Sequence, residues 1–217
     1  MRWLNDSKIT LLLVAFVLAL MLTAGSANAD FTFGEPTNLG PVVNSSSLDI
    51  MCCITTDGLE MYIFSNRPGG QGSWDLWVAT RPTTDADWGP AQNLGPTVNS
   101  PSQEGSACIS ADGLSLYFPS DRPGGYGQLD IWVARRETKA DKWGIPVNLG
   151  PTVNSGVAGY PDISADGLSL YFGSDRAGGS GGTDLWVTTR ETTDDNWGPP
   201  VNLGPTVNST TSVVRHR

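Results

Sequence analysis

The chain has 217 residues and a formal net charge of −9, with 22 acidic against 13 basic side chains. This acidity disfavours nucleic acids and anionic membrane surfaces as partners, because both require a basic face. The one histidine, His216, lies beside the C-terminus and far in sequence from the three cysteines, which disfavours a thiol–imidazole catalytic pair and a zinc site.

The N-terminal segment has the pattern of an export signal. Arg2 and Lys8 precede the apolar stretch from Ile9 to Leu22, and the small residues Ala27-Asn28-Ala29 follow it. We therefore predict a signal peptide over residues 1–29 with cleavage after Ala29, and a secreted or periplasmic location. A retained membrane anchor is the alternative, but the stretch is short for a span of about 20 residues.

A long motif then occurs three times. Residues Trp88 to Gly95 return as Trp143 to Gly150 and as Trp197 to Gly204, at spacings of 55 and 54 residues. An Asp-Gly-Leu triplet also recurs between these copies, beginning at Asp57, Asp112 and Asp166. A period of this size indicates tandem units that stack on one another. We place the repeats at 44–98, 99–153 and 154–208, within one domain over residues 30–217.

Each repeat reads as four short antiparallel strands. In the middle copy we expect strands at Ser106–Ser110, Leu114–Phe118, Asp130–Ala134 and around Trp143–Leu149. The Asp-Gly pair between the first two favours a tight hairpin, and Ser120 to Gly127 reads as a glycine-rich turn. This make-up is typical of a β-propeller blade. One additional strand of the fourth type is predicted at Phe33–Gly40.

Six of the eight tryptophans fall at repeated positions, which predicts packing between blades rather than ligand contact. The exception of interest is Trp74, which lies on a variable loop where the other copies have Leu129 and Thr183. We therefore take Trp74 as a candidate ligand contact. The repeated tryptophans are Trp77, Trp132 and Trp186 on the third strands, and Trp88, Trp143 and Trp197 before the fourth strands.

The segments Ser110 to Phe118, Ser120 to Gly125 and Asp130 to Val133 resemble the WD40-like β-propeller repeat of TolB type, common in exported bacterial proteins. The resemblance runs from about Phe31 to Ser209. It implies an all-β stack of blades that acts as a non-catalytic binding module for a protein or glycan partner. Closed propellers usually need at least four blades, so three copies leave blade edges open. A homo-oligomer that completes the ring, an open stack and a truncated gene product are the alternatives.

Acidic residues precede each inner strand. Asp49 and Glu104 lie eight residues before Asp57 and Asp112, and we assign Asp162 to the same role in the shorter third copy. In a propeller these carboxylates would approach the mouth of the central channel, where they could bind a cation, a sugar or a basic peptide. Paired carboxylates are also what glycoside hydrolases use, so a carbohydrate-active hydrolase is the alternative function. Solvated loop acids are the plainer interpretation.

The glycine-rich turns are bounded by oxygen ligands, Asp121 with Asp130 and Asp175 with Asp184. Calcium prefers several oxygen ligands on a flexible loop, so a calcium site is the one metal hypothesis, and we expect no other cofactor. The alternative is a structural turn in which Arg122 pairs with Asp130 or with the turn backbone.

The cysteines and two asparagines complete the candidates. Cys53 and Cys108 share a repeat position, next to Cys52, and are predicted to be small buried residues on inner strands. Asn44 and Asn208 begin glycosylation sequons.

Overall fold

The computed structural model describes residues 34–210. The chain divides into two compact units at Asn38 and Leu39, and residues 34–38 of the first unit contain no helix or strand. The predicted signal peptide over residues 1–29 and His216 lie outside the described residues. Within the described range no helix is long and apolar enough to cross a membrane.

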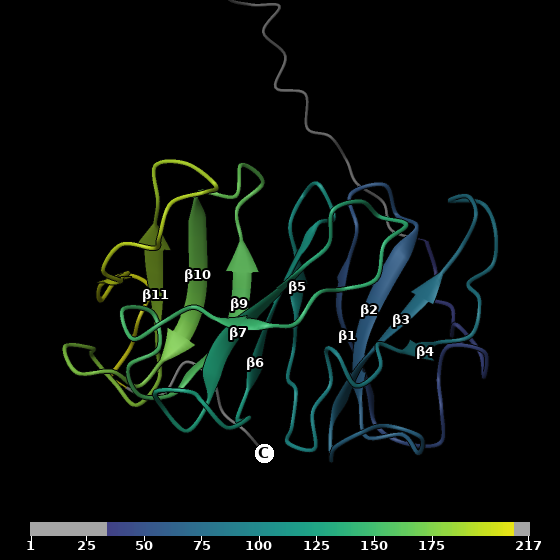
Figure 1. Ribbon diagram of the computed structural model, residues 1–217, viewed down its shortest axis with the longest axis horizontal. Helices are drawn as coiled ribbons and strands as arrows, with labels where there is room; N and C mark the ends of the chain where they lie inside the picture. Colours follow the sequence, from purple (N-terminus) through teal and green to yellow (C-terminus); the bar gives the residue numbers. More distant parts are fainter. Residues whose placement is uncertain (1–33, 211–217) are drawn as a thin grey trace, which may run out of the picture. The chain divides into compact units, whose positions relative to one another are not determined.

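From Leu39 onward the chain forms three four-stranded antiparallel sheets, each with its strands in consecutive order. Figure 1 shows them in chain order, from the purple-blue first sheet to the yellow-green third. The predicted all-β fold of tandem propeller-like blades is confirmed. The strands are β1(Asp49–Ile54), β2(Glu60–Ser65), β3(Asp75–Thr80), β4(Gln92–Asn93), β5(Cys108–Ile109), β6(Ser115–Ser120), β7(Asp130–Arg135), β8(Val147–Asn148), β9(Ala158–Ile163), β10(Ser169–Ser174), β11(Asp184–Thr189) and β12(Val201–Asn202).

The Asp-Gly pair makes the first hairpin of each blade. In the second blade Gly113 has φ +75°, a left-handed conformation that glycine adopts at little cost. The Asp112 carboxylate accepts hydrogen bonds from the Leu114 N–H (2.9 Å) and the Ser110 hydroxyl (2.5 Å). This closes the turn and sets the register from Ser115 onward. Asp57 and Asp166 make the same turn in the other two blades.

Both edge strands of the middle blade are shorter than the sequence predicts. The fourth strand of the middle blade is Val147–Asn148 rather than Trp143–Leu149. Pro146 has no N–H to donate to a sheet ladder, and the Gly144 N–H instead bonds the Arg135 carbonyl (2.8 Å). The first strand is likewise reduced to Cys108–Ile109, with one further bridge between Glu104 and Ser120.

The additional strand predicted over Phe33–Gly40 falls partly outside the described residues. Its described part, residues 34–40, contains no assigned strand. Each fourth strand pairs with the third strand of its own sheet, as β8 pairs with β7. Within residues 34–210 the third strands β3, β7 and β11 all follow this segment in the chain, and each pairs with the fourth strand of its own sheet.

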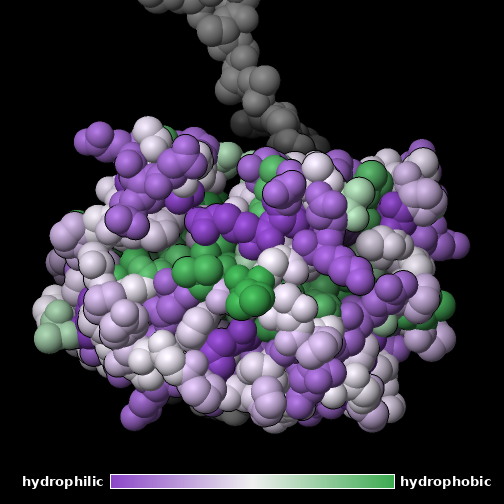
Figure 2. All heavy atoms as spheres, in the orientation of Figure 1, coloured by the Kyte–Doolittle hydropathy of each residue, from purple (hydrophilic) through white to green (hydrophobic). Residues whose placement is uncertain are grey.

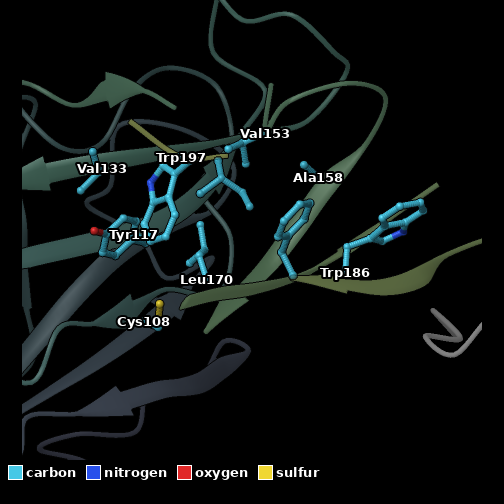
Figure 3. Packing of buried hydrophobic residues seen from close by; sticks show 10 residues of the cluster. Cys108, Tyr117, Val133, Val153, Ala158, Leu170, Trp186 and Trp197 are labelled. Carbon is cyan, nitrogen blue, oxygen red and sulfur yellow. The ribbon is translucent and has the colours of Figure 1, made fainter. Parts of the chain in front are cut away.

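The core consists of side chains between neighbouring blades. Tyr62 and Leu76 of the first blade meet Leu116 and Phe118 of the second in one buried cluster. The next cluster joins the second and third blades in the same way, and Figure 3 shows Tyr117 beside Trp197 within it. Burial of each large apolar side chain stabilises the fold by about 1.5–3 kcal/mol. All six repeated tryptophans lie in or against the three apolar clusters.

A tyrosine–tryptophan pair marks each junction between blades. The rings of Tyr62 and Trp143 meet edge to face, with centroids 6.3 Å apart and planes at 67°. Tyr117 and Trp197 repeat this arrangement at 6.5 Å and 71°. Such geometry adds to the free energy of burial by about 0.5–1.5 kcal/mol.

Candidate functional site

Asp49, the first residue of β1, is bound by three hydrogen-bonding side chains. Its carboxylate accepts from the Ser65 hydroxyl (2.6 Å), from Arg67 Nη2 (2.5 Å) and from the Ser45 hydroxyl (2.8 Å). Burial raises the pKa of Asp49, but these hydrogen bonds together with the Ser45 N–H outweigh burial and lower it to about 2. Asp49 is therefore part of a closed network rather than a free channel-mouth acid.

Glu104 occupies the same place in the second blade and is 1% exposed. Arg122 Nη2 lies 2.8 Å from its carboxylate, and the hydroxyls of Ser100 (2.6 Å) and Ser120 (3.1 Å) also donate to it. Burial raises the pKa of Glu104, and the serine and arginine hydrogen bonds oppose this shift. The same Arg122 nitrogen bonds the Val98 carbonyl (2.6 Å), so the ion pair also holds the linker before the blade. Arg122 therefore pairs with Glu104, which corrects the expected pairing with Asp130.

Asp162 is not the third member of this series. Asp49 stands opposite Ser65 and Glu104 opposite Ser120, whereas Ala158 stands opposite Ser174 in the third blade. Asp162 instead pairs in register with Tyr171, and it is exposed. The linker before the third blade is one residue shorter, which places alanine where the other blades have an acid.

Cys53 and Cys108 occupy the register position of Asp162 in their own blades. Cys108 is buried, Cys52 and Cys53 are half-buried, and all three are free thiols. Burial raises the pKa of the Cys108 thiol, and the negative charge of Asp162 adds to this shift. A raised pKa disfavours the reactive thiolate, so these cysteines pack as small apolar side chains.

The aspartates of the glycine-rich turns bind backbone N–H groups. The buried Asp130 carboxylate accepts from Tyr126 (2.5 Å) and Gly127 (2.9 Å) and from Asn148 Nδ2 (2.8 Å). A Cβ at Gly125 would lie 2.2 Å from Asp130 Oδ2, so only glycine fits there. Asp184 repeats this role, with Ser180 and Asn202 as donors, while Asp121 and Asp175 accept from the N–H groups of Gln103 and Val157. Across residues 34–210 no three His, Cys, Asp or Glu side chains gather as a metal site.

The asparagine of each linker is a structural residue that the sequence analysis missed. Asn154 accepts from the Ile131 N–H (2.9 Å) and donates to the Ile131 carbonyl (3.0 Å), so it ties the linker to β7. Asn99 and Asn208 do the same for Leu76 and Leu185. The repeated Val-Asn-Ser triplet carried this signal. Because Asn208 is 2% exposed, its predicted sequon is not accessible for glycosylation in the folded chain.

A hollow of about 650 Å³ is lined by residues from all three blades. Trp74 lies on its wall with its ring 5.2 Å from that of Phe64, and Glu104 also lines it. Tyr160 reaches the hollow from an irregularity in β9, with φ +53°, a conformation that tyrosine adopts only under strain. Figure 2 shows hydrophobic side chains gathered in a strip across the middle of the viewed face. Exposed hydrophobic side chains that line the hollow are Leu48, Ile50 and Tyr160.

The outer face of the third blade differs from the same face of the other blades. Tyr62 and Tyr117 are each 1% exposed, whereas their counterpart Tyr171 is 42% exposed. Val207 is 51% exposed, although the corresponding linker residues Val98 and Val153 are fully buried. The face that a following blade covers in the first and second blades is therefore exposed to solvent in the third blade.

No model of a known protein family matches the chain, and no curated protein matches it in sequence. Among solved structures the chain is similar to TolB from Acinetobacter baumannii, with 18% sequence identity and a TM-score of 0.44. The similarity covers 68% of this chain and 31% of the TolB chain. The chain thus spans less than a third of that protein, and a likeness of this degree concerns the fold alone.

Proposed function

We propose that this chain is an exported, non-catalytic β-propeller-type module that binds proteins through its rims and open faces. The observation that carries the proposal is the exposure of Tyr171 and Val207, whose counterparts in the other blades are buried against a following blade. An exposed apolar face of this kind is characteristic of an interaction surface. It favours a partner that supplies a second apolar sheet face.

The partner proposed for this face is a second copy of the chain. If the first blade of one copy packed on the third blade of another copy, Val43 of the first and Val207 of the second would compete for one position. Both residues belong to the same repeated linker, so this head-to-tail arrangement is disfavoured. Val43 already covers Met61 and Ile63 on the first blade, and all three are buried. The third-blade faces are open in both copies, so a two-fold dimer through these faces needs no displacement.

Sedimentation of the full chain tests this proposal. The wild-type chain should dimerise at micromolar concentration, and Tyr171→Glu should remain monomeric, because a charge in the centre of an apolar interface is unpaired and desolvated. Tyr126→Glu is the matched control, since Tyr126 is 61% exposed on a turn. A wild-type monomer, or equal dimerisation of both variants, would reject the dimer.

A ligand site in the hollow is a second candidate function. Trp74, Phe64 and Tyr160 present aromatic rings there, and such rings suit apolar peptide side chains or the apolar faces of sugars. Peptide and glycan arrays probed with the wild-type chain and with Trp74→Ala distinguish the two ligand classes. Signals that do not change in Trp74→Ala would place any binding elsewhere.

A carbohydrate-active hydrolase is less well supported by this geometry. Such an enzyme needs two carboxylates that reach the substrate. Asp49 and Glu104 are instead held by Arg67 and Arg122. A glycosidase screen with Glu104→Gln as control tests this alternative, and turnover lost in that variant would restore it.

A further inference from the structure

We propose that Arg176, Ser174 and Ser155 of the third blade form a binding site for the carboxylate group of a ligand. The ligand would take the place that the chain's own acids, Asp49 and Glu104, fill in the first two blades. The proposal rests on a comparison of the three repeats and does not depend on dimerisation through the open face.

The first two blades define what the site binds. In each, an arginine, a serine at the end of the second strand and a serine of the linker donate hydrogen bonds to one internal carboxylate. For Glu104 these donors are Arg122 Nη2 (2.8 Å), the Ser120 hydroxyl (3.1 Å), and the Ser100 hydroxyl (2.6 Å) and N–H (3.2 Å). The corresponding donors to Asp49 are Arg67, Ser65 and Ser45.

Arg176 keeps the geometry of this arrangement without the acid. Its Nη2 donates to the Val153 carbonyl and its Nε to the Ser174 hydroxyl (3.1 Å), as Arg122 does with Val98 and Ser120. Its guanidinium carbon lies 5.2 Å from the centroid of the Trp186 ring, against 5.3 Å for Arg122 over Trp132. The guanidinium is therefore placed where it would meet a carboxylate.

No carboxylate occupies that position in the third blade. Ala158 stands opposite Ser174 and its side chain ends at Cβ. Within residues 34–210 the ion pairs are made by Arg67, Arg122, Arg136 and Lys139, and none is made by Arg176. Asp175 contributes a nearby negative charge, but it forms no ion pair with Arg176, and its Oδ1 accepts the Val157 N–H (2.8 Å). Burial lowers the pKa of Arg176, and the negative charge of Asp175 opposes this shift.

The hydroxyl groups of Ser174 and Ser155 are also available to donate hydrogen bonds to a ligand. The hydroxyl of Ser174 accepts from the N–H and Nε of Arg176, and in the described part of the chain it donates to no acceptor. Ser155 is exposed and forms no hydrogen bond with residues 34–210, unlike Ser45 and Ser100 at the same linker position. The Arg176 guanidinium and the adjacent Ser174 hydroxyl suit a carboxylate, because charge-assisted hydrogen bonds are short and strong, and Ser155 is the further donor expected from the position of Ser45 and Ser100 in the linker.

The site lies beside the hollow. Val157 and Gly159, on either side of Ala158, both line it, and so does Glu104, the acid of the second blade. A carboxylate bound by Arg176 would therefore lie at the rim of the same hollow. An organic acid and the C-terminal carboxylate of a peptide share this chemistry.

Titration of the full chain with small carboxylates at constant ionic strength tests the proposal. Acetate and N-acetylglycine should produce saturable shifts of the Arg176 Nε–H resonance, whereas the neutral N-acetylglycinamide should produce none. Arg176→Gln should weaken binding by roughly 10-fold or more, from the loss of charge-assisted hydrogen bonds. Tighter binding of N-acetylglycine than of acetate would identify a peptide terminus as the ligand type, and equal binding would identify a small organic acid.

Ala158→Glu provides a second arm, because it restores an internal acid that competes with the ligand. This variant should bind neither carboxylate and should melt at a higher temperature than the wild type. Ala165→Glu is its control, since Ala165 is an exposed residue of the same blade, and it should bind as the wild type does. If Ala158→Glu fails to fold, Ser155→Ala replaces it, with weaker binding expected. No saturable binding by the wild type, or equal binding by Arg176→Gln, would overturn the proposal.

Discussion

Arg122 Nη2 lies 2.8 Å from the carboxylate of Glu104, and the two residues form an ion pair. Glu104 is 1% exposed, so the carboxylate is shielded from solvent. The pair joins three segments of the chain, because Arg122 belongs to the glycine-rich turn, Glu104 precedes the first strand of the second blade, and the Val98 carbonyl bound by Arg122 belongs to the linker before that blade. Residues that resemble a binding site in sequence thus stabilise the blade.

Replacing Glu104 by alanine should destabilise the chain by about 3–5 kcal/mol, because it leaves Arg122 as an uncompensated buried charge. Urea unfolding measures the loss. The double variant Glu104→Ala/Arg122→Met should be less destabilised than the sum of the two single variants, since it removes both charges. A loss below about 1 kcal/mol in Glu104→Ala would contradict the structural role.

Asp49 should make stability depend on pH in the acid range. Its pKa falls from 3.8 in the unfolded chain to about 2 in the folded one, so the unfolded state takes up the proton first as the pH decreases. The contribution, roughly 2 kcal/mol, is therefore complete above pH 3.8 and is lost as the pH falls through about 2. The difference in unfolding free energy between the wild type and Asp49→Asn, measured from pH 5 to pH 2, should shrink accordingly. A constant difference would be inconsistent with the lowered pKa.

Cys108 should resist alkylation in the folded chain. It is 6% exposed, and burial raises the pKa of its thiol, so at neutral pH neither access nor thiolate is available. Iodoacetamide followed by peptide mass spectrometry should label Cys108 only after denaturation. Rapid labelling of Cys108 under native conditions would show that the inner strands open.

The equivalent tyrosines of the second and third blades should differ in their effect on stability. Tyr117→Ala removes a buried ring that packs on Trp197 and should cost about 3–5 kcal/mol, the range for buried aromatic residues. Tyr171→Ala removes an exposed ring and should cost less than about 1 kcal/mol in the monomer. Thermal unfolding at low protein concentration compares the two variants, and equal losses would mean that the third blade is covered.

The sequence predicted the architecture well because period, turn chemistry and apolar strands all agree in each copy. It predicted the length of the fourth strand of the middle blade poorly. Residues 143–146 have the composition expected before a strand, but Pro146 has no N–H to donate to the sheet, and only Val147–Asn148 pair. Asp162 was assigned to the wrong position because residue type was matched across a linker that is one residue shorter. The pairing of Arg122 with Glu104 joins residues 18 positions apart across a hairpin, and such a contact requires the register to be known.

The role of the linker asparagines was visible in the repeated Val-Asn-Ser triplet but was not interpreted. Asn154 binds both backbone groups of Ile131, and this pattern of hydrogen bonds follows from packing, not from local sequence. The open face of the third blade is similarly a matter of burial, because Tyr171 and Tyr117 occupy identical sequence positions.

A cross-link at Tyr171 shows whether two copies of the chain associate through the open face of the third blade. In a two-fold dimer through this face, both copies of residue 171 belong to the same interface, and mild oxidation of Tyr171→Cys should join the chains as disulfide-linked dimers. Tyr126→Cys should give no such product under the same conditions. Chains with Tyr171→Cys that stay monomeric after oxidation, at concentrations where the wild type sediments as a dimer, would show that the dimer does not form through this face.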